Sequence, residues 1–163
     1  HQLATWATIN FAYTYRNERE VTELVSLARE PEKVSRLLRL LQAGLGHRLA
    51  FTVEDAKIAL SAEERVATPL GFLEASLSAT ATRATFDRAI GAATSRLYEA
   101  AGACIAAAGL KPDAIEAIFL TGGSSRVPAV RRAVVQAAPN ARIAGGSDLL
   151  SVALGLAQMS GRK

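Results

Sequence analysis

The sequence predicts a helix-rich α/β fold, and three observations lead to that class. Half of the 163 residues are hydrophobic but only 6% are aromatic, because alanine, leucine and valine carry most of the apolar content. A long amphipathic helix is expected from about Phe86 to Ala108. A short apolar run, Ile115 to Thr121, precedes two glycines and a helix that begins at Pro128. Helices that cover a sheet are the expected architecture for this pattern.

Three helices are predicted in the first sixty residues, after a mixed apolar and aromatic segment over 1–15. The first spans Glu18 to Arg29. The second begins at Pro31, since proline is tolerated in a first helical turn, and its apolar residues fall at i, i+3, i+4 and i+7. Gly44 and Gly46 are expected to end it. The third helix is expected from His47 to Leu60.

The middle of the chain predicts a hairpin and then the long helix. Residues alternate from Glu64 to Ser78, which favours a small antiparallel hairpin with Gly71 at the turn, and Pro69 argues against a central strand. The long helix has Thr82 or Thr85 as its expected cap and Gly109 as its end. Its apolar stripe includes Cys104, which we therefore expect in the core.

Two strand–Gly-Gly–Ser–helix units are predicted in the last third. Lys111-Pro-Asp113 begins a short helical turn, and Ile115 to Thr121 is apolar on both faces, as in a central strand covered by helices. Arg142-Ile-Ala144 is a second short strand, and Gly145-Gly-Ser-Asp148 leads into a last helix that ends near Ser160. Both glycine turns would lie at the same sheet edge, where α/β proteins bind ligands.

Composition and charge exclude several classes of protein. No apolar run approaches the ~20 residues of a membrane span. The net charge of +4 is modest, and the arginines lie close to acidic residues, so nucleic-acid binding is not supported. A single cysteine excludes an internal disulfide and predicts a reducing, cytoplasmic compartment. The chain begins at His1 and its one methionine is Met159, so we expect a piece of a longer protein.

The glycine turn is the first candidate site. Gly122 and Gly123 let backbone N–H groups turn inward and let a ligand approach without a Cβ in the way. The following helix N-terminus would add partial positive charge. The turn is therefore a candidate nucleotide or phosphate cradle, and an ordinary strand-to-helix turn is the alternative.

The second candidate lies on the predicted third helix. Glu54, Lys57 and Ser61 fall at i, i+3 and i+7, opposite Val53, Ala56 and Leu60. A carboxylate can accept hydrogen bonds from ribose hydroxyls, an ammonium can donate to them, and a serine can bond a base edge. A solvated helix face with a Glu–Lys pair is the alternative. No metal site is predicted, because His1 and His47 lack partners at metal spacing.

Both candidates belong to motifs that resemble the DnaK-type heat-shock chaperone ATPases. Val53-Glu-Asp-Ala-Lys-Ile-Ala-Leu-Ser61 resembles their adenosine-contacting helix, and Leu120-Thr-Gly-Gly-Ser-Ser-Arg-Val-Pro128 resembles their second adenosine motif. Ala81-Thr-Arg-Ala-Thr-Phe86 is similar to the entry of the long helix between them. The likeness covers roughly residues 47–157, and the N-terminal stretch looks closest to the YegD-type, chaperone-like branch.

The resemblance implies an actin-like ATPase fold, of which this chain holds the later part of the second lobe. Residues 1–84 would form the outer, mostly helical subdomain and residues 85–163 half of the inner α/β subdomain. Glu54 and Lys57 would hold the ribose, and Ser61 would meet the adenine. Arg126 would stack on the base, with Ile58 on its other face. The glycine turn would lie along the nucleoside and α-phosphate side, through Gly122, Gly123 and Ser124.

The sequence also departs from that family. Asp148 precedes the last Ala-x-Gly helix by one residue too many, so it is either a ligand-contacting residue or a helix cap. No Asp-x-Gly-x-Gly-Thr motif occurs, and no carboxylates for Mg²⁺ or a positioned water are offered, so the chain alone is not expected to hydrolyse ATP.

Three functions therefore follow from the resemblance. The chain is an ATP- or ADP-binding part of a chaperone-like ATPase, or a non-catalytic module that docks a nucleotide-exchange or co-chaperone protein. A sugar-kinase-type lobe is the third alternative, against which the Glu54–Ser61 pattern argues. The inner sheet would lack neighbouring strands, so self-association through its exposed edge is also expected.

Overall fold

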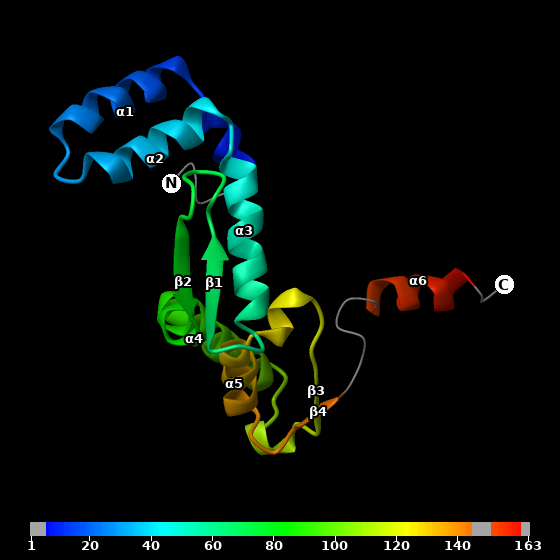
Figure 1. Cartoon of the computed structure of the whole chain (residues 1–163). Helices are drawn as coiled ribbons and strands as arrows, with labels where there is room; N and C mark the ends of the chain where they lie inside the picture. The colour runs from blue at the N-terminus through cyan, green and yellow to red at the C-terminus, as the bar shows by residue number, and fades with distance from the viewer. Residues whose placement is uncertain (1–5, 145–150, 161–163) are drawn as a thin grey trace. The chain divides into compact units, whose positions relative to one another are not determined.

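The computed structural model describes residues 6–144 and 151–160 and confirms a helix-rich α/β fold with small sheets. The chain divides into two compact units, His1–Thr82 and Arg83–Lys163. Each unit has its own two-stranded sheet, antiparallel in the first and parallel in the second. Figure 1 shows the elements of both units.

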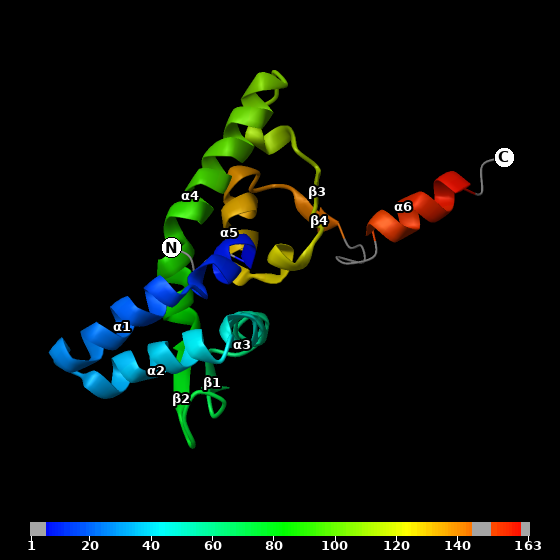
Figure 2. The same ribbon diagram turned by 90° about the horizontal axis from the view of Figure 1, so that it is seen from above.

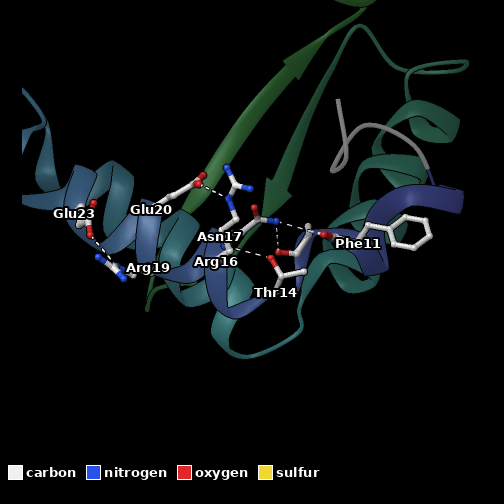
Figure 3. Close-up of polar contacts among 8 residues, drawn as sticks. Phe11, Thr14, Arg16, Asn17, Arg19, Glu20 and Glu23 are labelled. Carbon is white, nitrogen blue, oxygen red and sulfur yellow. Dashed lines mark hydrogen bonds and ion pairs between the residues drawn. The ribbon is translucent and has the colours of Figure 1, made fainter.

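The first unit begins with a 3-10 helix, η2 (Trp6–Ala12), and the helical pair α1 (Tyr15–Leu27) and α2 (Pro31–Gln42), which pack against each other. The helix α1 begins three residues earlier than predicted because Thr14 caps it, its hydroxyl accepting from the Asn17 amide at 3.2 Å. The Asn17 side chain donates to the carbonyl oxygens of Phe11 and Ala12 (Figure 3). These bonds connect the end of η2 to the first turn of α1.

The predicted start of α2 at Pro31 is confirmed, and Gly44 ends it with a φ of 62°. The expectation that Gly46 also ends α2 is wrong, because Gly46 is the first residue of α3 (Gly46–Ala59). Its amide donates to the Tyr13 hydroxyl at 2.7 Å, and a Cβ there would lie 2.8 Å from Ile9 Cγ1. Ile9 is only 1% exposed. The lack of a side chain at Gly46 therefore allows η2 and α3 to approach closely.

The predicted hairpin exists, but its second strand comes later than expected. The strands β1 (Arg65–Pro69) and β2 (Ser78–Thr82) are antiparallel, with Ala67 opposite Thr80. Gly71 lies in a turn, as predicted, where the Leu73 amide donates to the Leu70 carbonyl oxygen at 2.8 Å, but this turn is only the first part of a connection over 70–77. The weak alternation after Leu73 was misleading because Leu73 is buried in the core of this unit and not in a strand.

Two arginines of α2 hold this connection in place. Arg36 makes two hydrogen bonds to the Glu74 carboxylate, at 2.6 and 3.1 Å, and the Arg39 guanidinium donates to the Leu73 carbonyl oxygen. The hydrogen bond from Arg36, with its positive charge, holds the pKa of Glu74 below the ordinary value of 4.5. Leu73 then packs with Ala12, Leu40 and Leu41 in the core of the first unit.

The second unit is built on α4 (Arg83–Ala107), which ends where predicted, before Gly109 with a φ of 71°. The helix α5 (Pro128–Ala137) packs on α4 through alanines at i, i+4 and i+8, which are Ala129, Ala133 and Ala137. The expected core position of Cys104 is wrong, because its side chain is exposed. Regularly spaced apolar residues give a helix an apolar face, but they do not ensure that another element packs on that face.

The parallel sheet of the second unit joins β3 (Ala117–Phe119) and β4 (Arg142–Ala144), with the short helical turn η3 (Pro112–Ala114) before them. The predicted strand Ile115 to Thr121 is therefore real but shorter. The expectation that helices cover both of its faces is wrong in this structure, since Phe119 is 78% exposed. The last helix, α6 (Ser151–Ser160), ends where the sequence predicts.

Replacing Gly46 tests the close approach of η2 and α3. In Gly46→Ala the new methyl group would overlap Ile9 and the Tyr13 hydroxyl, so we expect the free energy of unfolding to fall by roughly 2 kcal/mol. Gly71→Ala is the matched control, because a Cβ there meets nothing within 4 Å. Urea denaturation followed by circular dichroism measures both, and equal stability of the two variants would contradict this packing.

The Arg36–Glu74 contact predicts a pH dependence of stability. A carboxyl group whose pKa is lowered by folding stabilises the folded state above its unfolded pKa, and this contribution is lost as the pH falls through the lowered value. We expect Glu74→Gln to melt below the wild type at neutral pH, and the difference to disappear on acidification below about 4.5. A difference in melting temperature that is constant with pH would show that Glu74 acts through packing alone.

Candidate functional site

One face of α3 carries the first group of predicted site residues. Of the three apolar residues predicted opposite the polar ones, Ala56 and Leu60 are buried, whereas Val53 is 57% exposed. Glu54 and Lys57 form an ion pair with 2.6 Å between Lys57 Nζ and Glu54 Oε1. Their side chains are 44% and 39% exposed. The two charges therefore remain accessible from solvent while they neutralise each other.

Ile58 and Ser61 complete this group at the C-terminal end of α3. Ile58 is 56% exposed, an unusual position for a large aliphatic side chain on a helix that has a buried face. Ser61 is half-buried in the turn after α3, where its amide donates to the Ile58 carbonyl oxygen at 3.0 Å. The four residues thus combine a carboxylate, an ammonium, a hydroxyl and an apolar surface. These are suitable groups for contacting a ribose and a planar base.

The glycine turn of the second unit has a backbone that only glycine adopts readily. Gly122 has φ 82° and ψ 162°, a conformation that is unfavourable for residues with a Cβ. The 3-10 turn η4 (Gly123–Arg126) follows, and then α5 from Pro128. The α5 N-terminus thus comes six residues after Gly122. The helix-dipole effect falls off within the first turn of a helix. The α5 N-terminus therefore adds less partial positive charge at the two glycines than we expected from the sequence.

Ser125 fixes this turn from the inside, and sequence reasoning did not assign it this role. Its side chain is buried, and its hydroxyl donates to the Gly122 carbonyl oxygen at 2.7 Å. The Arg131 guanidinium donates to the Ser125 carbonyl oxygen at 3.4 Å. The sequence did contain a sign of this role. Two adjacent serines follow the two glycines, and only one of two adjacent serines can face the interior.

The other turn residues face solvent. Gly123, Ser124 and Arg126 are exposed, while the neighbouring Val127 is 5% exposed. A Cβ on Gly123 would meet nothing within 4 Å, and its φ is not in the left-handed region. The fold itself therefore has no need of a glycine at this position. A glycine here also leaves the backbone open to close approach by another group.

The second predicted glycine turn, Gly145-Gly-Ser-Asp148, lies outside the described residues, and so does Asp148. Within residues 6–144 and 151–160, no group of three side chains that could hold a metal ion is found. No helix in this described part of the chain is both long and apolar enough to cross a membrane.

A comparison with protein families identifies the class to which these features belong. The family model described as Hsp70 protein matches residues 39–157, which is well over half of the chain. The matched range contains α3 with its exposed polar face, the hairpin, α4 and the glycine turn, in that order. The chain belongs to the Hsp70 family, a family of actin-like, nucleotide-binding chaperone ATPases.

Replacing each glycine of the turn separates a need of the fold from a need of a ligand. We expect Gly122→Ala to lower the free energy of unfolding by roughly 1–3 kcal/mol, because alanine is strained at φ 82°. Gly123→Ala should leave stability within about 0.5 kcal/mol of the wild type. Thermal denaturation of the two variants checks this, and a large loss in Gly123→Ala would mean that the fold requires both glycines.

Proposed function

We propose that this chain is the adenosine-binding part of a chaperone-like, actin-fold ATPase, and that it does not hydrolyse ATP alone. The observation that carries the proposal is the Hsp70-family match over residues 39–157, a range that includes both groups of candidate residues. In this proposal residues 1–84 are the outer subdomain and residues 85–163 half of the inner subdomain of a longer protein of the YegD-like branch. A cytoplasmic location agrees with the single, exposed cysteine.

Each group would contact a different part of the nucleotide. On α3, Glu54 would accept hydrogen bonds from ribose hydroxyls and Lys57 would donate to them, while Ser61 would contact the adenine edge. Ile58 would cover one face of the base. In the glycine turn, Gly122, Gly123 and Ser124 would lie along the nucleoside and the α-phosphate. Arg126 would stack on the base, since a planar guanidinium on a π-face gains about 0.5–2 kcal/mol.

In this proposal ATP hydrolysis depends on groups that other parts of a longer protein supply. Phosphoryl transfer depends on Mg²⁺ held by carboxylates and on a positioned water. The sequence has no Asp-x-Gly-x-Gly-Thr motif to bind the phosphates. The Mg²⁺ and most phosphate contacts would come from other parts of the longer protein. We therefore expect adenine nucleotides to bind this chain with a dissociation constant of about 1 mM or weaker.

A second candidate function is a protein-interaction module that docks a nucleotide-exchange or co-chaperone partner. It is supported by exposed apolar residues at the end of α1, outside the matched range, where Leu24 is 53% and Leu27 81% exposed at i, i+3. Neighbouring apolar side chains left in solvent are typical of surfaces that bind other proteins. Self-association through the edges of the β3–β4 sheet remains part of the first proposal, because among the described strands each has one partner only.

A titration of the chain with ATP, followed by NMR chemical shifts, distinguishes the two functions. We expect shifts at the amides of both groups, and a loss of affinity of about fivefold or more in Arg126→Ala and Glu54→Gln. Arg88→Ala is the matched control for Arg126→Ala, because it removes the same charge from an exposed position of α4. Its affinity should equal that of the wild type.

Three outcomes would contradict the nucleotide proposal. Shifts confined to one of the two groups would show that the other is only a structural feature. Equal loss of affinity in Arg126→Ala and Arg88→Ala would show that net charge alone attracts ATP. No shifts at millimolar ATP would favour the interaction module.

A further inference from the structure

A cleft of about 630 Å³ lies on the side of α3 away from the polar face described above. It is bounded by one stripe of α3, by β1 and by the start of the connection that follows β1. The α3 stripe consists of Arg48, Thr52, Asp55, Ala56 and Ala59. The volume of the cleft is within the range of about 300–1,000 Å³ that is typical of ligand sites. No residue of the candidate nucleotide groups lines this cleft.

The cleft follows the free edge of β1. Four consecutive residues, Val66 to Pro69, line it, although side chains of a strand alternate between its two faces. Both views place β1 between β2 and α3 (Figures 1 and 2). In the described sheet β1 pairs with β2 alone, so its other edge has no partner strand. The cleft is therefore positioned where a third strand would extend the sheet under α3.

The pairing register shows which backbone groups face this edge. Leu70 donates its amide to the Leu77 carbonyl oxygen at 2.8 Å. Because hydrogen-bonded and non-bonded pairs alternate in an antiparallel ladder, Thr68 and Val66 also bond toward β2. The N–H and C=O groups of Arg65 and Ala67 therefore point away from β2. Pro69 limits the free edge at its end, since it has no N–H to donate.

A buried hydroxyl beside the cleft lacks a partner among the described residues. Thr68 is 7% exposed, and its Oγ1 makes no hydrogen bond to any of them. An unsatisfied buried polar group costs about 1–3 kcal/mol. Rotation about the Cα–Cβ bond of Thr68 exchanges its methyl and hydroxyl groups, so an acceptor placed in the cleft would satisfy it.

Two residues of opposite charge, Arg48 and Asp55, line the cleft from α3. The Arg48 guanidinium lies over the Phe72 ring, with 4.7 Å between Arg48 Cζ and the ring centroid. Neither this guanidinium nor the Asp55 carboxylate has an ion-pair partner in the described part of the chain. The two residues are seven positions apart on α3, which corresponds to about 10 Å along the axis. Side chains on one face of a strand are about 7 Å apart at i, i+2 and about 13 Å apart at i, i+4. The i, i+4 spacing is the nearer match, because the long arginine and lysine side chains can bridge the remaining few ångströms.

We propose that this cleft binds an extended peptide segment as a third strand beside β1. The peptide pairs with the backbone of Arg65 and Ala67, directs an acidic side chain to Arg48 and directs a basic side chain to Asp55. Main-chain pairing of this kind supplies affinity, and the side-chain contacts supply specificity. A second copy of β1 fits the cleft less well, because Arg-Val-Ala-Thr-Pro contains no acidic residue for Arg48.

The probe is the fluorescently labelled peptide acetyl-Val-Asp-Val-Thr-Val-Lys-Val-amide, which places both charges on one face of an antiparallel strand. The control peptide has serine in place of the aspartate and the lysine. Fluorescence anisotropy with the full chain should show at least about tenfold tighter binding of the charged peptide. This ratio corresponds to two charge-assisted contacts of modest strength. Equal affinity for the two peptides would overturn the proposal.

Two proline variants test the strand pairing. Ala67→Pro removes an N–H that points into the cleft, and Thr80→Pro removes the equivalent N–H on the outer edge of β2. We expect Ala67→Pro to weaken the charged peptide about fivefold or more and Thr80→Pro to leave it unchanged. Equal effects of both variants would contradict pairing at β1. Thermal melting checks that both variants fold.

A charge exchange keeps the proposal testable if a proline variant does not fold. Asp55→Lys should weaken the charged peptide, and a peptide with aspartate in place of its lysine should recover the affinity. Absence of this recovery would overturn the assignment of Asp55. A molecular mass that rises with protein concentration in the absence of peptide, and that Asp55→Lys leaves unchanged, would instead assign the edge to a second copy.

Discussion

The close approach of η2 and α3 at Gly46 is the constraint on which the first unit depends. With no side chain at this position, the Gly46 amide reaches the Tyr13 hydroxyl and the helix rests against the buried Ile9. This contact fixes where α3 begins. The buried Ala56 and Leu60 then determine which of its faces turns toward β1. All other functional features of the unit follow from this orientation of α3.

The orientation of α3 gives the helix two separate candidate binding surfaces. Glu54, Lys57 and Ile58 lie on the side away from β1, whereas Arg48 and Asp55 line the cleft beside it. The i, i+3 and i+4 spacings keep the first set on one face, and the i, i+7 spacing keeps Arg48 and Asp55 on another. A substitution in one set therefore leaves the contacts of the other unchanged. The nucleotide proposal and the peptide proposal can be tested on the same chain without interference.

The sequence predicted the helices better than the sheets, for a physical reason. Helical patterns depend on local spacing, so Pro31 and Gly109 marked their helix ends correctly. Strand pairing depends on distant residues, and the position of Leu73 in the core moved the second strand of the hairpin to Ser78. The exposure of Cys104 and Phe119 has the same origin, because periodicity identifies a face but not what covers it.

Candidate site residues that belong to a local sequence motif could be predicted. Contacts that depend on how the chain folds in space could not. The residue types of α3 and the glycine turn could be read from the sequence, whereas the inward bond of Ser125 to Gly122 required the structure. The cleft beside β1 was not predicted at all. Arg48, Asp55 and the Thr68 hydroxyl lack ion-pair or hydrogen-bond partners among the described side chains, and this depends on which residues lie next to each of them in space.

The Glu54–Lys57 ion pair of α3 is compatible with the nucleotide contacts proposed for these two residues. An exposed pair at i, i+3 contributes only about 0.3–0.5 kcal/mol to a helix, so the fold gains little from it. For the same reason a ribose can replace the contact at low cost, since each charge exchanges one partner for a hydroxyl group. In the absence of a nucleotide, the pair keeps both side chains ordered and neutralised. A weak internal bond between two accessible charges is therefore compatible with a binding role.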